Sequence, residues 1–244
     1  MRAIDLARIF FRSLSIGASF NYSRMQNIGF AYSLIPLVKR MGGDIKGTAE
    51  ILERHIQIFY SHPYMTGPII GSVVRLEESC KGADCSEVIK LKKSLMAPYA
   101  AIGDPFFWGA LKPLSVIVGV IMAIKGMLLA PLIAILIYNF ISIWVRLKGF
   151  VEGYRDGRGA VDYLKTINMP KISREIRWVS VFLLALLSAV MLAVQSVPGV
   201  EKFGYVGGLL VLVAIIICSW VIQKGISPLV IIYGSLILFF VIII

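Results

Sequence analysis

The sequence predicts an all-α integral membrane protein, in which short amphipathic and re-entrant helices are followed by about five transmembrane helices. Three observations support this prediction. Of the 244 residues, 58% are hydrophobic and 16% are charged, and the mean hydropathy of +0.82 exceeds what a soluble core of this size needs. Residues 1–100 hold about half of the 25 Lys and Arg and no long apolar run. Almost every later stretch of about 20 residues is apolar enough to span hydrocarbon.

Residues 1–100 are expected to form an amphipathic and re-entrant helical region at the cytoplasmic or interfacial side. Residues 3–16 place their apolar side chains near one helical stripe, and residues 28–41 do much the same. The next helix runs from Thr48 to Tyr60 and should end near His62, because Pro63 disfavours helix in the residue before it. Further helices are expected from residue 67 and over residues 86–95. Breaks between such helices are tolerated at membrane depth only where protein or a water-filled cavity covers the backbone.

The transmembrane region is expected to cover residues 101–244. Its apolar segments are 106–124, 126–145, 178–197, 205–222 and 225–244. The basic linker 146–177 should face the cytoplasm, whereas 196–204, with Lys202 as its one Lys or Arg, should face outward. This multi-pass arrangement puts the N-terminus inside and Ile244 outside. The Lys112-Pro113 pair and the tight turn at residues 225–228 leave four or six crossings as alternatives.

Composition also excludes several functions. The net charge is +11, but the basic residues lie beside apolar segments, which indicates anionic lipids rather than nucleic acid. The three cysteines do not make a disulfide framework or a metal-binding spacing. The sequence has neither a phosphate-binding loop for ATP nor a zinc-protease helix. We therefore expect no metal, no cofactor and no catalytic residue, so that a partner or a gradient must drive any transport.

The most informative candidate residue is Asp104, which stands between Gly103 and Pro105 at the start of an apolar segment. A carboxylate there is costly unless it is paired or functional. Gly103 allows close backbone approach, and Pro105 can open a helix whose N-terminal dipole stabilises the carboxylate. Two interpretations stay open: Asp104 caps a helix, or it contacts a polar solute at a broken membrane helix.

Four further polar residues are candidates for the substrate path or for contact with a partner. His62, within Phe59-Tyr-Ser-His-Pro63, is either a structural hydrogen bonder or faces a solute or a partner. Arg24 and Gln26 lie in the polar word Asn21-Tyr-Ser-Arg-Met-Gln26, and Arg24 can contact lipid phosphate or a partner subunit. Asn139 lies in an otherwise apolar helix and is expected to bond to another helix.

These words resemble the IID component of mannose/fructose/sorbose-family sugar phosphotransferase systems over roughly residues 5–160. The resemblance rests on residues 21–30, on residues 54–63, and on the Gly-Asp-Pro-x-x-Trp signature, which supplies Asp104 and Trp108. Tyr60, Ala97 and Ala101 depart from the family pattern and mark a divergent member. Each adds bulk where we expect backbone and solute to approach closely.

The resemblance implies a bacterial inner-membrane subunit that forms, together with a IIC subunit, the translocation path for a hexose. The sugar would be phosphorylated by IIB during import, with IIA upstream, so this chain needs no phospho-acceptor of its own and is enzymatic only as part of the enzyme II complex. A multimer of IIC–IID pairs is also implied. The alternative is a IID-like scaffold or regulatory subunit that does not transport sugar. A stand-alone secondary transporter is disfavoured, because the chain lacks two comparable membrane repeats.

Overall fold

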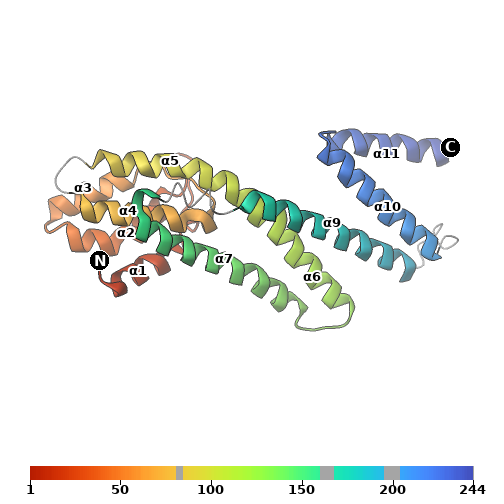
Figure 1. Cartoon of the computed structure of the whole chain (residues 1–244), viewed down its shortest axis with the longest axis horizontal. Coiled ribbons are helices and arrows are strands. Elements are labelled where there is room, and N and C mark those ends of the chain that lie inside the picture. Colours follow the sequence, from red (N-terminus) through yellow and green to blue (C-terminus); the bar gives the residue numbers. More distant parts are fainter. Residues whose placement is uncertain (81–84, 160–167, 195–203, 244) are drawn as a thin grey trace.

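The computed structural model describes residues 1–80, 85–159, 168–194 and 204–243, and these residues are helical apart from turns and two isolated β-bridges. Helices α1 to α5 gather at one end of the molecule (Figure 1). From there α6 and α7 extend as a long pair, α9 lies beside α6, and α10 and α11 lie at the other end (Figure 1). The predicted all-helical fold is confirmed for the described part of the chain.

The N-terminal bundle contains the short helices that the apolar patterns predicted. It comprises α1 (Ala3–Ser13), α2 (Asn27–Met41), α3 (Ile45–His55), the 3-10 turn η1 (Pro63–Met65) and α4 (Thr66–Ser79). Ile9 and Phe10 of α1 are buried, whereas Ile4 and Phe11 stay exposed on its outer face. This helix therefore presents apolar side chains both to the bundle and to its surroundings.

One predicted boundary is wrong. The helix expected at Thr48–Tyr60 begins at Ile45, where the Asp44 carboxylate caps it by accepting from the Gly47 N–H at 2.8 Å, and it ends at His55. The backbone of Phe59 instead pairs with Arg24 and Gln26, at 3.3 and 2.9 Å. His62 consequently caps the start of η1, where Pro63 takes the first position that proline favours, and does not end α3.

Close helix packing joins the bundle to the membrane helices. Helix α4 lies against α7 (Ala130–Asp156), and Gly67 and Gly71 of α4 leave no room for a Cβ against the α7 backbone. Gly153 of α7 is equally tight against the Pro68 carbonyl. Small residues that let two helix backbones touch are the usual device for packing helices in membranes.

The Gly-Asp-Pro-x-x-Trp motif that contains Asp104 lies within a single continuous helix. Helix α5 (Ser86–Gly103) continues without a break into the π-helix η2 (Asp104–Leu111) and then into α6 (Lys112–Ile124). Asp104 makes no capping hydrogen bond among the described residues, and its backbone is helical, so the N-cap interpretation of Asp104 is wrong. The Lys112-Pro113 pair, which made the number of crossings uncertain, does not interrupt the helix. A π-turn changes the hydrogen-bond spacing and so accommodates prolines within a continuous helix.

Two helices of the described chain are long and apolar enough to cross a membrane, namely Ser86–Ile124 and Ala130–Gly159. Beyond them lie α9 (Met169–Val194), α10 (Gly204–Gln223) and α11 (Pro228–Ile243), and a short 3-10 turn η3 (Gly157–Gly159) follows α7. The predicted number of about five crossings is therefore not confirmed. The proposed boundary at residue 100 falls within α5, and both described ends of the basic segment 146–177 are helical; residues 160–167 lie outside the described part.

Candidate functional site

The candidate site is built around His62, which is 2% exposed. Its imidazole stacks on Phe107 of η2, with ring centroids 4.8 Å apart, and meets the edge of Trp108 at 5.0 Å. The ring of Tyr64, which belongs to η1, lies 5.4 Å from it. We call His62, Tyr64, Phe107 and Trp108 the aromatic cluster. It joins the η1 turn to the helix that carries Asp104.

The protonation of His62 follows from its surroundings. Burial, reinforced by the nearby Arg146 guanidinium, lowers the pKa of His62 to about 4, so the ring is neutral at physiological pH. Its Nδ1 accepts a hydrogen bond from the Tyr64 N–H at 3.2 Å, which places the ring proton on Nε2. This Nε2–H is buried and has no hydrogen-bond partner in the described chain. His62 thus offers one unused donor.

The close approach of Gly103 fixes where the imidazole lies. A Cβ on Gly103 would come within 2.5 Å of the His62 Cβ and within 2.7 Å of its Cγ. Asp104 follows directly and is half-buried, and no hydrogen bond or ion pair of its carboxylate is found among the described residues. Trp108 is 54% exposed, so the cluster reaches the molecular surface at the indole.

Arg146 of α7 contacts the η1 side of the aromatic cluster. Its guanidinium is buried and donates to the carbonyls of Pro63 and Leu14, the latter at 3.4 Å. It also lies 5.4 Å above the Tyr64 ring. These bonds hold the η1 turn against α7, because the planar guanidinium satisfies several acceptors at once. Arg146 is therefore a positioning residue for His62.

The structure brings together some of the predicted candidates and leaves others apart. Gln26 is buried, and its Oε1 accepts from the Ser61 N–H at 3.4 Å, so it holds the segment that leads into His62. The Arg24 side chain is exposed. The Asn139 amide donates to the Ile135 carbonyl of its own helix at 2.9 Å, and the interhelical bond expected of it is not found among the described residues.

Sequence reasoning missed Tyr64 and Phe107 as parts of the site. Both are aromatic residues in apolar surroundings, and nothing in their local patterns separates them from ordinary core residues. Their position in chain order, directly after His62-Pro63 and between Asp104 and Trp108, is the one signal that could have indicated them.

A second buried polar cluster lies in the N-terminal bundle. The Glu77 carboxylate is 2.8 Å from His55 Nε2 and 3.7 Å from Arg54 Nε. Burial lowers the pKa of His55, although Glu77 acts in the opposite direction. Glu78 pairs with the N-terminal amine and Tyr154. These contacts tie α3, α4 and α7 together and are structural.

The described residues contain no group of three or more His, Cys, Asp and Glu side chains that could hold a metal. Cys80 and Cys85 are joined by a disulfide, with a Cα–Cα distance of 5.9 Å, whereas no disulfide framework was expected from the three cysteines. The aromatic cluster offers a hydrogen-bond donor, an exposed indole face and a nearby carboxylate. Such an arrangement can bind and orient a polar ligand.

Fold and site define the class first: an all-helical membrane protein whose aromatic cluster is suited to binding a polar ligand. The family described as the mannose/fructose/sorbose IID component of the phosphotransferase system matches residues 1–244, and the chain belongs to this family. Its function is that of a IID component in sugar transport. The membrane nature of the protein follows from the same family.

Curated relatives agree over almost the whole chain. The fructose permease IID component of Bacillus subtilis is 29% identical, over 94% of this chain and 91% of the relative. The mannose-specific EIID component of Escherichia coli K12 is 29% identical, over 94% of this chain and 89% of the relative. The sorbose-specific EIID component of Klebsiella pneumoniae is 31% identical, over 81% and 75%.

Solved structures share the fold. A chain of the mannose transporter ManYZ, determined in complex with microcin E492, is 25% identical and has a TM-score of 0.62, over 99% of this chain and 96% of that one. A second membrane protein structure has a TM-score of 0.71 at 24% identity, over 98% of this chain and 96% of that one. The scaffold interpretation is not favoured, because the relatives bear the names of sugar-specific components.

Proposed function

We propose that this chain forms, with a IIC subunit, the path by which a hexose enters the cell and is phosphorylated by IIB. The observation that carries the proposal is the Nε2–H of His62, which has no hydrogen-bond partner among the described residues and lies beside the exposed indole of Trp108. The imidazole also lies against Gly103, the residue that precedes Asp104. Sugar sites combine aromatic faces with a few well-placed polar groups. Phosphoryl transfer then belongs to IIB, and the role of this chain is to position the sugar.

The departures from the family pattern lie at the surface. Ala97 and Ala101 are exposed, and Tyr60 is 44% exposed. The side-chain atoms that they add therefore lie at the protein surface. Those of Ala97 and Ala101 are exposed on α5, where a partner can contact them. This placement supports a divergent substrate or IIC contact rather than a closed path. Arg24 and Asn139 remain proposed contacts with the partner.

The remaining parts of the proposal concern location and assembly. We place the protein in the bacterial inner membrane, with residues 1–100 as a cytoplasmic or interfacial region, residues 101–244 as the membrane region, the N-terminus inside and Ile244 outside. The assembly is a multimer of IIC–IID pairs that is served by IIB and IIA. The likeness to a chain of the mannose transporter ManYZ supports a role within such a complex.

The test is uptake of labelled hexoses by phosphotransferase-deficient cells that carry this chain and its IIC and IIB partners. We compare the wild type with His62→Phe, which keeps a ring against Phe107 but removes the Nε2–H, and with Asp104→Asn. Accumulation of sugar phosphate only with all partners present supports transport. If the His62→Phe complex assembles normally but takes up hexose about tenfold or more slowly, the Nε2–H of His62 belongs to the sugar-binding site. An assembled complex that takes up no hexose contradicts the proposal.

A further inference from the structure

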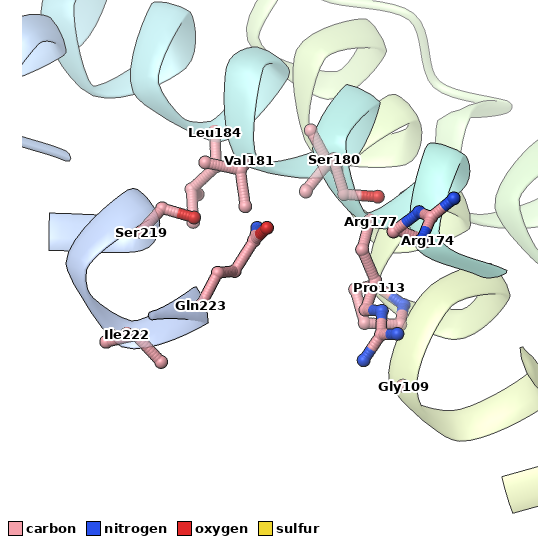
Figure 2. Close-up of a pocket in the computed structure, with 11 residues that line it drawn as sticks. Gly109, Pro113, Arg174, Arg177, Ser180, Val181, Leu184, Ser219, Ile222 and Gln223 are labelled. Atoms are coloured by element: carbon pink, nitrogen blue, oxygen red, sulfur yellow. The ribbon is translucent and has the colours of Figure 1, made fainter. Parts of the chain in front are cut away.

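A cavity of about 520 Å³ lies between η2 and α6 on one side and α9 and α10 on the other, and no residue of the aromatic cluster is among its described lining residues. Figure 2 shows the residues around it, with the Gln223 side chain extending from α10 toward α9 and two arginines on the side of Pro113. The lining residues are Gly109, Pro113, Ile117, Arg174, Arg177, Ser180, Val181, Leu184, Ser219, Ile222 and Gln223.

The polar part of this cavity is suited to an anion. Arg174 and Arg177 lie three residues apart on α9 and therefore on one face of the helix. Within the described chain, neither guanidinium has a hydrogen-bond or ion-pair partner. The lining adds the Ser219 hydroxyl and the Gln223 amide as neutral donors and includes no carboxylate. Two free guanidinium forks with neutral donors match the oxygens of a phosphate group.

The remaining wall of the cavity is apolar. Ile117 of α6, Val181 and Leu184 of α9, and Ile222 of α10 line it. The outer faces of the same helices are also apolar, since Val179, Phe182 and Trp220 are about half exposed. The cavity therefore lies between helices whose surfaces suit hydrocarbon, with its cationic end on the basic segment that the positive-inside bias places at the cytoplasmic leaflet.

We propose that this cavity is a binding site for one anionic phospholipid, with the phosphodiester held by Arg174 and Arg177 and the glycerol and first acyl carbons against the apolar wall. A phospholipid is favoured over a soluble phosphate because charge and apolar surface adjoin in a single cavity. Anionic headgroups of the cytoplasmic leaflet attract arginines of this kind. The site is separate from the sugar path and does not depend on it.

The test measures binding of radiolabelled dioleoyl phosphatidylglycerol to the purified complex of this chain with its IIC partner, in neutral detergent. The double variant Arg174→Gln/Arg177→Gln removes the phosphate contacts, and we expect its affinity to fall about tenfold or more. Ser219→Phe fills the cavity without changing the charge and should lower the affinity similarly. The matched control is Lys148→Gln/Arg155→Gln, which removes two exposed charges from α7 that do not line the cavity.

Each outcome decides the proposal. Loss in both cavity variants and wild-type binding in the α7 control supports a specific lipid site. Equal loss in the two charge variants, with Ser219→Phe unaffected, shows general attraction to the membrane surface and overturns it. Displacement of the labelled lipid by millimolar inorganic phosphate or hexose phosphate shows a site for soluble anions and overturns the choice of ligand. Circular dichroism and co-purification with IIC verify that every variant is folded, and Arg174→Lys/Arg177→Lys, which keeps the charges, should retain part of the binding.

Discussion

At the scale of single residues, His62 has the clearest dependence on its surroundings. Two features fix its state: the Tyr64 N–H on Nδ1 and the burial that lowers its pKa to about 4. The ring is too far inside the protein, and too weakly basic, to behave like an exposed histidine. It is best understood as a neutral donor with a set tautomer.

The lowered pKa of His62 predicts how stability depends on pH. The folded protein binds a proton on His62 less readily than the unfolded chain does. The free energy of unfolding is therefore highest above about pH 6.5 and declines as the pH falls toward about 4. We expect the thermal midpoint of the detergent-solubilised protein to fall over this window, and to fall less in His62→Phe. His55 contributes in the same direction in both proteins, so the difference between the two pH profiles isolates His62. Identical profiles would contradict the assignment.

At the scale of elements, the close approach of η1 to the α5–η2 helix rests on the absence of a side chain at Gly103. We predict that Gly103→Ala displaces the imidazole, since the new Cβ would lie 2.5 Å from the His62 Cβ. Hexose uptake should fall at least about tenfold, because a donor displaced by an ångström loses its hydrogen bond.

The matched control for this prediction is Gly109→Ala. It lies in the same π-helix, but its Cβ would meet no neighbour closer than the Asp104 carbonyl, at 3.9 Å. Uptake by this variant should equal that of the wild type. If both variants lost activity alike, helix stiffness in η2, not the contact with His62, would explain the effect.

The α4–α7 contact gives a second prediction at this scale. Gly153→Ala would push a methyl group into the Pro68 carbonyl, and overpacking of this kind costs about 1–3 kcal/mol. We expect a lower thermal midpoint and less assembled complex. Gly234→Ala in α11 has open space around it and should be neutral or slightly stabilising, because alanine favours helix. Equal midpoints in the two variants would show that α4 and α7 adjust without cost.

At the scale of the whole molecule, the question is how the helices are threaded through the membrane. We predict that reporter fusions after residue 2 and after residue 160 report the cytoplasmic side, because basic residues concentrate around both points. A fusion at Ile244 should report the outside. A cytoplasmic result at Ile244 would indicate that α10 and α11 do not both cross, which the lengths of their apolar parts leave open.

The sequence by itself determined the all-helical membrane character and the words that carry the family resemblance. Hydropathy and helical periodicity are local properties, so composition and spacing reveal them without knowledge of contacts. The words around Asp104 and His62 were identified in the same way, although α3 was placed too late in the chain. Proline rules favour a helix boundary before Pro63 but do not say whether a helix ends there or begins.

Only the tertiary structure decided which of these sequence motifs contact one another. His62 and Gly103 are far apart in sequence, and their contact depends on glycines that let α4 and α7 touch and on Arg146, which holds η1. The continuity of α5 through Asp104, and the cavity that brings Arg174 and Arg177 of α9 together with residues of α6 and α10, are likewise properties of packing. Long-range contacts of this kind follow from the fit of whole surfaces, which no local pattern encodes.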